Sequence, residues 1–366
     1  MKIPVPALLE ATSAICLVPS RAGIMSSEFI KLRADKKSLK MSLAAEIYGT
    51  TVAKAIEPGE KPWTFYVDRA SFEPFVQASH NLGQKAPFVF SITDDEKPQL
   101  IVSCGSRKAI FQEVQQITGY SDKMDFEGRV LNLSATQKAS LRLASKYATI
   151  DPTFAHLNCV YLLKGKSIVA SNQLSAIIID DPVVPMSVPL PLLLLSILDD
   201  DQVKSIVVSP AFAKVTTPAG FLCQLTSTKA AAEFPIKTIL KNMKKAKSEF
   251  PQRFVLKASS LLAALKRLEA YVATIVRRDM TVTVSGKKGE SKIKLVASIP
   301  SGRFEEPVKV EAPGLSEDVS FELLLATLLP LNDVSIEMGK VSVSYTDESP
   351  FYFTSKGMQL LVSRKA

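Results

Sequence analysis

The sequence predicts an α+β protein of three tandem domains, each with two helices packed on antiparallel sheets. Three times along the 366 residues, an extended stretch leads into an amphipathic helix, then β-rich sequence, then a second, leucine-rich helix. The three copies open at residues 1–16, 129–148 and 253–273. Each copy is long enough to bury a core of its own, so the repeats indicate domains instead of the turns of a solenoid.

The elements within each copy follow from the spacing of the apolar residues. The second helices are indicated by VDRASFEPFVQAS, VPLPLLLLSIL and VSFELLLATLL, which begin at Val67, Val188 and Val319. Alternating or β-branched runs bounded by turn residues predict strands in SEFIKLRA, PQLIVSC, YLLKGKSIVAS, MTVTVSG and KVSVSY. A polar stretch and a lysine-rich stretch separate the copies and place the domains at 1–124, 125–251 and 252–366.

The first helix of the second copy has a basic stripe. Lys138, Arg142 and Lys146 recur every four residues, on a face other than the apolar one. A stripe of this kind is usually just a solvated helix face. The first helix of the third copy again places basic residues, Lys266 and Arg267, away from its leucines. This recurrence favours a shared charged surface.

Composition and charge narrow the class of protein. The chain is 46% hydrophobic and 22% charged, which is typical of a globular protein. Its net charge of +9 suits a polyanionic partner, DNA or RNA before a membrane. The longest apolar run, 183–198, is broken by three prolines and is too short to span a bilayer. Glu10 lies inside the first apolar stretch, which argues against a signal peptide.

The cysteines and histidines give no indication of a metal or redox site. Cys16, Cys104, Cys159 and Cys223 lie far apart without a C-x-x-C pair, so we expect reduced and mostly buried thiols. With only two histidines, a histidine-rich metal site is not expected. The sequence therefore predicts neither a bound metal nor a cofactor.

Two short motifs suggest chemistry but have simpler explanations. Gly165-Lys166-Ser167 resembles the end of a phosphate-binding loop, but Val160 stands where that loop needs glycine, and a strand follows instead of a helix. We interpret it as a hairpin turn. Asp199-Asp200-Asp201 follows a leucine-rich helix, where a solvated turn is expected instead of a metal site. No hydrolase, metalloprotease or dinucleotide motif is found, so we expect a protein that is not an enzyme.

The lysine-rich segment 237–247 contains five lysines. It could contact phosphates, or it could be a solvated helix that links two domains, and the sequence favours neither.

The order of these motifs resembles, over essentially the whole chain, the β-type sliding clamp of bacterial DNA polymerases (the polymerase III β subunit). MKIPVPALLEATSAICLVPSRAG resembles the opening helix and basic loop of that family. FAHLNCVYLLKGKSIVASNQLSA resembles the hairpin of its second domain, and LTSTKAAAEFPIKTIL keeps its Phe-Pro pair as Phe234-Pro235. QLLVSRKA falls where the chains of that family end.

This resemblance implies a head-to-tail homodimer that closes into a ring around duplex DNA without reading its sequence. The ring would tether the replicative DNA polymerase, be placed on DNA by a clamp loader, and act in the cytoplasm at the nucleoid. By analogy, the residues facing DNA are Arg21, Arg69, Lys138, Arg142, Lys146, Lys266 and Arg267. No membrane, cofactor or catalytic site is implied.

The resemblance also implies a pocket for short hydrophobic motifs of the polymerase and loader. Its walls would be Leu157, Ser171, Leu174, Leu240, Leu360, Val362, Ser363 and Arg364. Ordinary core is the alternative for Leu157 and Leu174. The seam between subunits would contain Ile110, Phe111, Tyr271 and Val272, which could instead be buried in their own domains.

Three features depart from the family pattern. SNQLS replaces its T-D-G-H-R-L type segment, and VSRKA replaces its M-P-M-R-L type tail. The chain is also basic overall, whereas such clamps are commonly acidic outside their central hole. A divergent clamp encoded by a bacteriophage with its own polymerase would fit all three. The competing hypothesis is a repeat-domain protein that coats DNA or RNA without encircling it. Such binders stack bases on aromatic residues along a basic groove, and aromatics are only 7% of this chain.

Overall fold

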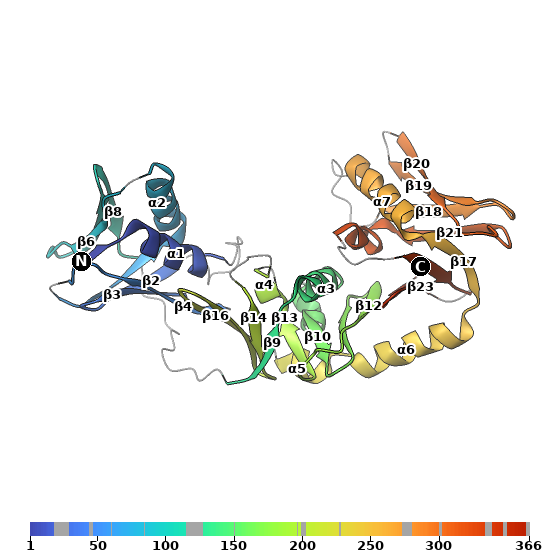
Figure 1. The fold of residues 1–366 in the computed structure, drawn as a ribbon, viewed down its shortest axis with the longest axis horizontal. Helices are drawn as coiled ribbons and strands as arrows, with labels where there is room; N and C mark the ends of the chain where they lie inside the picture. Colours follow the sequence, from blue (N-terminus) through green and yellow to red (C-terminus); the bar gives the residue numbers. More distant parts are fainter. Residues whose placement is uncertain are drawn as a thin grey trace. The chain divides into compact units, whose positions relative to one another are not determined.

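The computed structural model confirms an α+β fold of antiparallel sheets and helices (Figure 1). The structure describes residues 1–17, 29–43, 47–59, 61–83, 85–114, 127–149, 151–195, 197–198, 203–226, 228–272, 280–299, 302–333, 339–346 and 350–363. Within these ranges, no helix is long and apolar enough to cross a membrane. The chain divides into two compact units, Met1–Asn132 with Leu193–Thr226, and Leu133–Leu192 with Ser227–Ala366.

The first unit is built on an eight-stranded antiparallel sheet in the order β5-β2-β3-β4-β16-β15-β14-β9. Its strands are β2 (Phe29–Ala34), β3 (Ser38–Leu43), β4 (Ile47–Lys54), β5 (Trp63–Asp68), β9 (Arg129–Asn132), β14 (Ser205–Val208), β15 (Phe212–Thr217) and β16 (Gly220–Leu225). β4 and β16 pair closely, and glycine is required at Gly220 because a Cβ there would overlap the carbonyl oxygen of Thr50. A four-stranded sheet, β1-β6-β7-β8, consists of β1 (Lys2–Ile3), β6 (Phe88–Ile92), β7 (Gln99–Cys104) and β8 (Arg107–Gln112).

Two helices of the first unit pack on each other. These are α1 (Val5–Ile15) and α2 (Arg69–Asn81), and α1 also lies against β3, β4 and β16. The side chain of Asp68 caps α2 by accepting a hydrogen bond from the backbone nitrogen of Ala70. Leu8 of α1 and Phe72 of α2 are fully buried, so the core of this unit lies beneath both helices.

The second unit has the same plan. Its eight-stranded sheet has the order β13-β10-β11-β12-β24-β23-β22-β17. The strands are β10 (Cys159–Leu163), β11 (Ser167–Ser171), β12 (Ser175–Asp180), β13 (Val188–Pro191), β17 (Gln252–Lys257), β22 (Lys340–Ser344), β23 (Phe351–Ser355) and β24 (Met358–Val362). A four-stranded sheet, β20-β19-β18-β21, consists of β18 (Thr281–Gly286), β19 (Lys292–Ile299), β20 (Gly302–Lys309) and β21 (Val319–Leu324).

The helices of the second unit cover both faces of its large sheet. The helical segments are α3 (Ala135–Lys146), η2 (Pro152–Leu157), α5 (Thr228–Glu233), α6 (Ile236–Glu249), α7 (Ala258–Val272), η3 (Leu325–Thr327) and η4 (Leu329–Asp333). Val169 and Ile178 share a core with Ile239 and Met243 of α6. Neighbouring residues of a strand point to opposite faces, so Ile177 faces the other side, where α3 packs on β10, β11 and β12. The sheet therefore separates α3 from α6.

One predicted helix is wrong. In the third copy, VSFELL forms strand β21 and pairs with β18, and only the short 3-10 segments η3 and η4 follow it. Val319, Phe321 and Leu323 are buried while Ser320 and Glu322 are exposed, which is the two-residue period of a strand. In the second copy, VPLP is strand β13, followed by the single turn α4 (Leu192–Leu195).

Several local predictions are confirmed. The five strand segments predicted above form β2, β7, β10 with β11, β18 and β22. The Gly165-Lys166-Ser167 segment is the turn between β10 and β11, where Gly165 has a φ of 62° that favours glycine. Each large sheet combines strands from two consecutive expected domains. The chain divides into two units by its contacts, so the division into three domains stays a prediction.

Candidate nucleic-acid interface and partner pocket

Helix α3 is positioned by its capping residues and its apolar face. Ser134 and Gln137 form a reciprocal capping box, with the Gln137 backbone nitrogen donating to the Ser134 hydroxyl at 3.2 Å and the Ser134 nitrogen donating to Gln137 Oε1 at 2.9 Å. Leu141 and Ala144 are buried. These contacts set which side of the helix faces the sheet and which side faces outward.

The outward side of α3 is basic. Arg142 and Lys146 are exposed, and Lys138 is half-buried one turn before Arg142. Four-residue spacing aligns the three side chains along the helix. Of the residues expected to face DNA, these three form a continuous stripe in the structure.

Lys266 and Arg267 of α7 are both exposed, but their surroundings differ. Arg267 Nε donates to Glu306 Oε2 of β20 at 2.7 Å. The Glu306 side chain is only 8% exposed, so Arg267 neutralises a buried carboxylate as well as presenting charge to solvent. Lys266 is therefore the better candidate of the two for a phosphate contact.

The prediction that Arg69 faces DNA is wrong. Arg69 is 4% exposed, and its Nη2 donates to the backbone oxygen of Cys16 at 2.8 Å while its Nε pairs with Glu73 at 3.1 Å. The side chain thus fastens α2 to the end of α1. Arg21, the other basic residue expected in this region, lies outside the described residues, as do Asp199, Asp200 and Asp201.

A pocket of about 250 Å³ opens beside α6. It is lined by His156, Leu157, Ser171, Asn172, Gln173, Ser175, Ala176, Pro235, Thr238, Ile239, Asn242, Leu361 and Ser363. Leu157, Ser171 and Ser363 were expected in the partner pocket, and the structure brings these three together. The backbone nitrogen of Ser363 also donates to the oxygen of Leu174 at 2.8 Å, which places the exposed Leu174 near the pocket.

The remaining residues expected in the partner pocket lie elsewhere. Leu360 and Val362 are fully buried in β24, and Leu240 lines a different cavity on the other side of α6. Arg364 lies outside the described residues. Sequence reasoning missed Thr238 and Asn242 of α6. The sequence could have indicated them, because Pro235 marks the start of a helix and residues four apart, such as Thr238 and Asn242, lie on one side of it.

The residues expected at the seam between subunits lie on edge strand β8 and on helix α7 beside edge strand β20. Ile110 lies on the edge strand β8 and is 54% exposed, whereas Phe111 is buried against the rings of Phe72 and Phe75 at 5.7 and 6.1 Å. A pocket of about 450 Å³ is lined by Asp68, Ser71, Phe75, Ala109, Ile110, Phe111, Gln112 and Val114.

The second edge is strand β20. Tyr271 of α7 is 41% exposed and stacks on Phe304 of β20, with ring centroids 4.5 Å apart. The side chain of Val272 lies outside the described residues.

The described residues contain no group of three or more His, Cys, Asp or Glu side chains that could hold a metal ion. All four cysteines are free and buried, as the sequence predicted. Burial raises the pKa of Cys16, Cys159 and Cys223 from 9.0 to about 12, which keeps these thiols protonated and unreactive at neutral pH.

Solved sliding clamps match this architecture along the whole chain. The DNA polymerase III subunit β of Pseudomonas aeruginosa aligns with a TM-score of 0.75 at 15% identity, covering 100% of this chain and 99% of that one. The DNA polymerase sliding clamp of Caulobacter crescentus gives 0.74 at 17%, covering 100% and 99%. The DNA polymerase III β subunit of Thermotoga maritima gives 0.75 at 16%, covering 100% and 98%. The chain has the sliding-clamp fold.

The resemblance inferred from motif order is thereby confirmed at the level of the fold. No family model and no curated protein matches the sequence. Four residues of the SNQLS segment, Ser171, Asn172, Gln173 and Ser175, line the pocket beside α6. This chain therefore has the clamp fold with a sequence that differs strongly from those of the solved clamps.

Proposed function

We propose that this protein is a DNA sliding clamp, a homodimeric ring that encircles duplex DNA and tethers a replicative DNA polymerase. The observation that supports it most is the match to sliding clamps over 100% of the chain. The basic stripe on α3 is the surface that such a ring requires. As a processivity factor, the protein would catalyse no reaction itself and would need no cofactor.

The charge of α3 suits sliding better than tight binding. Duplex DNA has about one negative charge per 1.7 Å of its axis, so a few basic side chains attract it without reading its sequence. Lys138, Arg142 and Lys146 follow a single helix and offer no aromatic or amide partner for a base edge. Retention would then come from closure of the ring around DNA.

The two edge strands offer a route to that closure. We propose that β8 of one subunit pairs with β20 of a second copy, head to tail, because each strand ends its sheet. Exposed Ile110 beside the 450 Å³ pocket on one edge, and Tyr271 stacked on Phe304 at the other, would supply apolar contact.

The pocket beside α6 is the proposed site for short hydrophobic motifs of the polymerase and the clamp loader. Its apolar floor includes Leu157, Ala176 and Ile239, and its exposed rim includes Thr238 and Ser363. Hydroxyl groups on a rim can bond the backbone of an inserted peptide while its side chains enter the floor. We propose that the protein acts at the nucleoid, in the cytoplasm of a bacterium infected by a phage that has its own polymerase.

Retention on circular DNA tests the proposed function. Dissociated subunits are allowed to reassemble in the presence of a nicked plasmid, and the complex is separated from free protein by gel filtration in moderate salt. We expect the protein to remain with the circle and to be lost when a restriction enzyme cuts it. Equal retention on linear and circular DNA would instead support a protein that coats nucleic acid, and would contradict the clamp.

A further inference from the structure

Helix α6 divides one face of the second unit's large sheet into two cavities. The pocket described above lies on the side of Thr238 and Asn242. A second cavity, of about 310 Å³, lies on the side of Leu240, Lys244 and Lys247. Ile239, Met243 and Ala246 face the sheet between them and are buried. Both cavities are formed within the second unit.

The second cavity has an apolar floor and a basic rim. Leu163, Ile178, Leu240 and Met243 form the floor. Lys166 from the β10–β11 turn and Lys244 and Lys247 from α6 line the cavity and are exposed, as is the single acidic residue, Asp180. Its lining therefore has a net positive charge. We call this site the lysine-rimmed cavity.

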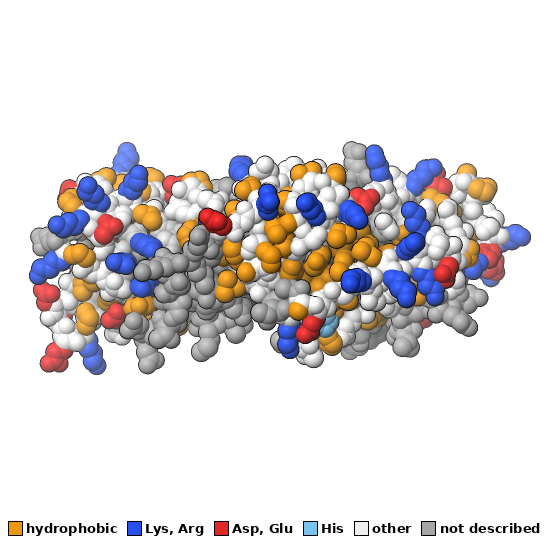
Figure 2. Space-filling view, turned by 90° about the horizontal axis from the view of Figure 1, so that it is seen from below, with side chains coloured by type: hydrophobic (Ala, Val, Ile, Leu, Met, Phe, Trp, Pro, Cys, Tyr) orange, Lys and Arg blue, Asp and Glu red, His pale blue; other side chains and the backbone are white. Residues whose placement is uncertain are grey.

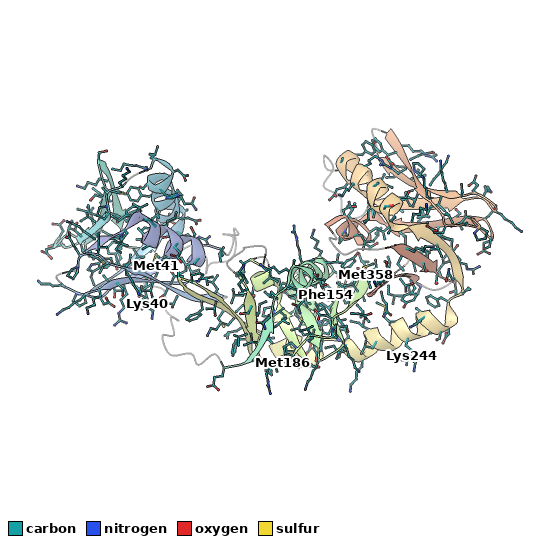
Figure 3. The ribbon with its side chains drawn as sticks, in the orientation of Figure 1. Lys40, Met41, Phe154, Met186, Lys244 and Met358 are labelled. Carbon is teal, nitrogen blue, oxygen red and sulfur yellow. The ribbon has the colours of Figure 1, made fainter. Side chains whose placement is uncertain are left out.

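The lysines of α6 are distributed unevenly around the helix. Lys244, which Figure 3 labels, and Lys247 lie at the lysine-rimmed cavity, and Lys237, Lys241 and Lys245 extend over the solvent side. The α6 side chains at the other pocket, Thr238 and Asn242, are neutral. Figure 2 shows lysine and arginine side chains gathered where α6 lies, beside an area of hydrophobic side chains. The two cavities thus differ in the charge of the ligand that they suit.

The rim lysines form no direct ion pair within the described part of the chain. Lys245 pairs with Glu249 at 3.8 Å on the solvent side of α6. Among the described residues, no carboxylate lies within 4.0 Å of the Nζ atoms of Lys166, Lys244 or Lys247. With Asp180 as the one carboxylate in the lining, the three lysines leave a net positive charge that attracts an anionic group.

We propose that the lysine-rimmed cavity binds an acidic peptide segment of a partner protein, with one aliphatic side chain anchored on the floor and carboxylates at the lysines. A nucleic-acid strand fits less well. Binders of single strands stack bases on aromatic side chains, and the residues lining this cavity include no aromatic. A volume near 300 Å³ lies at the lower end of ligand sites and suits one anchoring side chain.

Selection from a peptide library tests this proposal. Random twelve-residue peptides displayed on phage are first depleted on the Lys244→Glu/Lys247→Glu variant, and the remainder is selected on the full-length wild-type protein. We expect enriched peptides with Asp or Glu on both sides of a Leu, Ile, Val or Met. Failure to enrich any such peptide would overturn the proposal.

A matched variant then separates a defined site from general attraction. Lys241→Glu/Lys245→Glu makes the same change in charge on the same helix, away from the cavity. A synthetic enriched peptide should lose at least about tenfold in affinity with Lys244→Glu/Lys247→Glu and less than about threefold with the matched variant. Equal losses would overturn the proposal. So would an oligothymidylate that displaces the peptide and binds more tightly.

Discussion

The guanidinium of Arg267 lies 2.7 Å from the carboxylate of Glu306 and forms an ion pair with that buried group. The two residues join α7 to the edge strand β20. Arg267 thus differs from its neighbour Lys266, although the sequence suggests the same role for both. Arg267 stabilises a buried charge, whereas Lys266 is exposed and stays a proposed contact for DNA.

Truncation of each side chain should show this difference. Arg267→Ala leaves the carboxylate of Glu306 buried without its partner, and we expect the free energy of unfolding to fall by about 1–3 kcal/mol. Lys266→Ala, the matched control, should change it by less than about 0.5 kcal/mol. Urea unfolding followed by circular dichroism measures both. Arg267→Ala with Glu306→Gln should recover part of the loss, and equal stability of the two single variants would contradict the assignment.

The stripe on α3 should dominate the attraction to duplex DNA. Lys138→Glu with Arg142→Glu removes two of the proposed phosphate contacts. The slope of the logarithm of the association constant against the logarithm of salt concentration should become shallower by about 2. Fluorescence anisotropy with a short labelled duplex measures it.

The control for this experiment is Lys241→Glu with Lys245→Glu on α6, across the sheet from α3. It makes the same change in net charge and should leave the slope within about 0.5 of the wild-type value. If both pairs change the slope equally, duplex DNA responds to the total charge of the protein and not to α3.

The proposed seam between subunits makes a prediction about mass in solution. The wild-type protein should sediment as a particle of twice the 39.9 kDa chain. Ile110→Asp places a charge on the exposed edge of β8 and should give a monomer, because an unpaired charge in an apolar contact costs about 3 kcal/mol or more. Val183→Asp changes a side chain of similar exposure away from both edges and should remain a dimer. A monomeric wild-type protein would contradict the seam.

The buried thiols should make stability fall at alkaline pH. An unfolded thiol ionises near its ordinary pKa of 9.0, whereas burial raises the folded pKa of Cys16, Cys159 and Cys223 to about 12. Their contribution is fully present below pH 9 and is lost as the pH rises toward 12. The loss should reach about 1 kcal/mol per thiol at pH 10.

The midpoints of urea-induced unfolding at pH 8 and pH 10 measure this loss of stability. Cys223→Ala should reduce the difference between the two midpoints. A thiol-reactive disulfide reagent gives a second measurement. At pH 8, the native protein should react slowly and the unfolded protein at once, because the thiolate is the reactive form. Rapid reaction of the native protein would contradict the raised pKa values.

The sequence alone predicted those features that depend only on residues close together in the chain. The spacing of Lys138, Arg142 and Lys146 predicted a helix with one basic face, and Gly165 between two β-branched runs predicted the hairpin turn. The wide separation of the cysteines predicted free thiols. Each of these features is set within a few residues by helical period, turn geometry or the absence of a nearby partner.

Only the tertiary structure decided features that need contacts between distant segments. VSFELL suits a helix or a strand by itself, and its hydrogen bonds to β18 make it a strand. Arg69 looks like a surface residue until the end of α1 places the Cys16 carbonyl beside it. The lysine-rich segment 237–247 could be a linker until Met243 docks on the sheet and α6 separates a neutral pocket from a basic one. Burial and pairing across the chain outweigh local preference in these cases, because the free energy of a packed side chain or a sheet hydrogen bond depends on its distant partner.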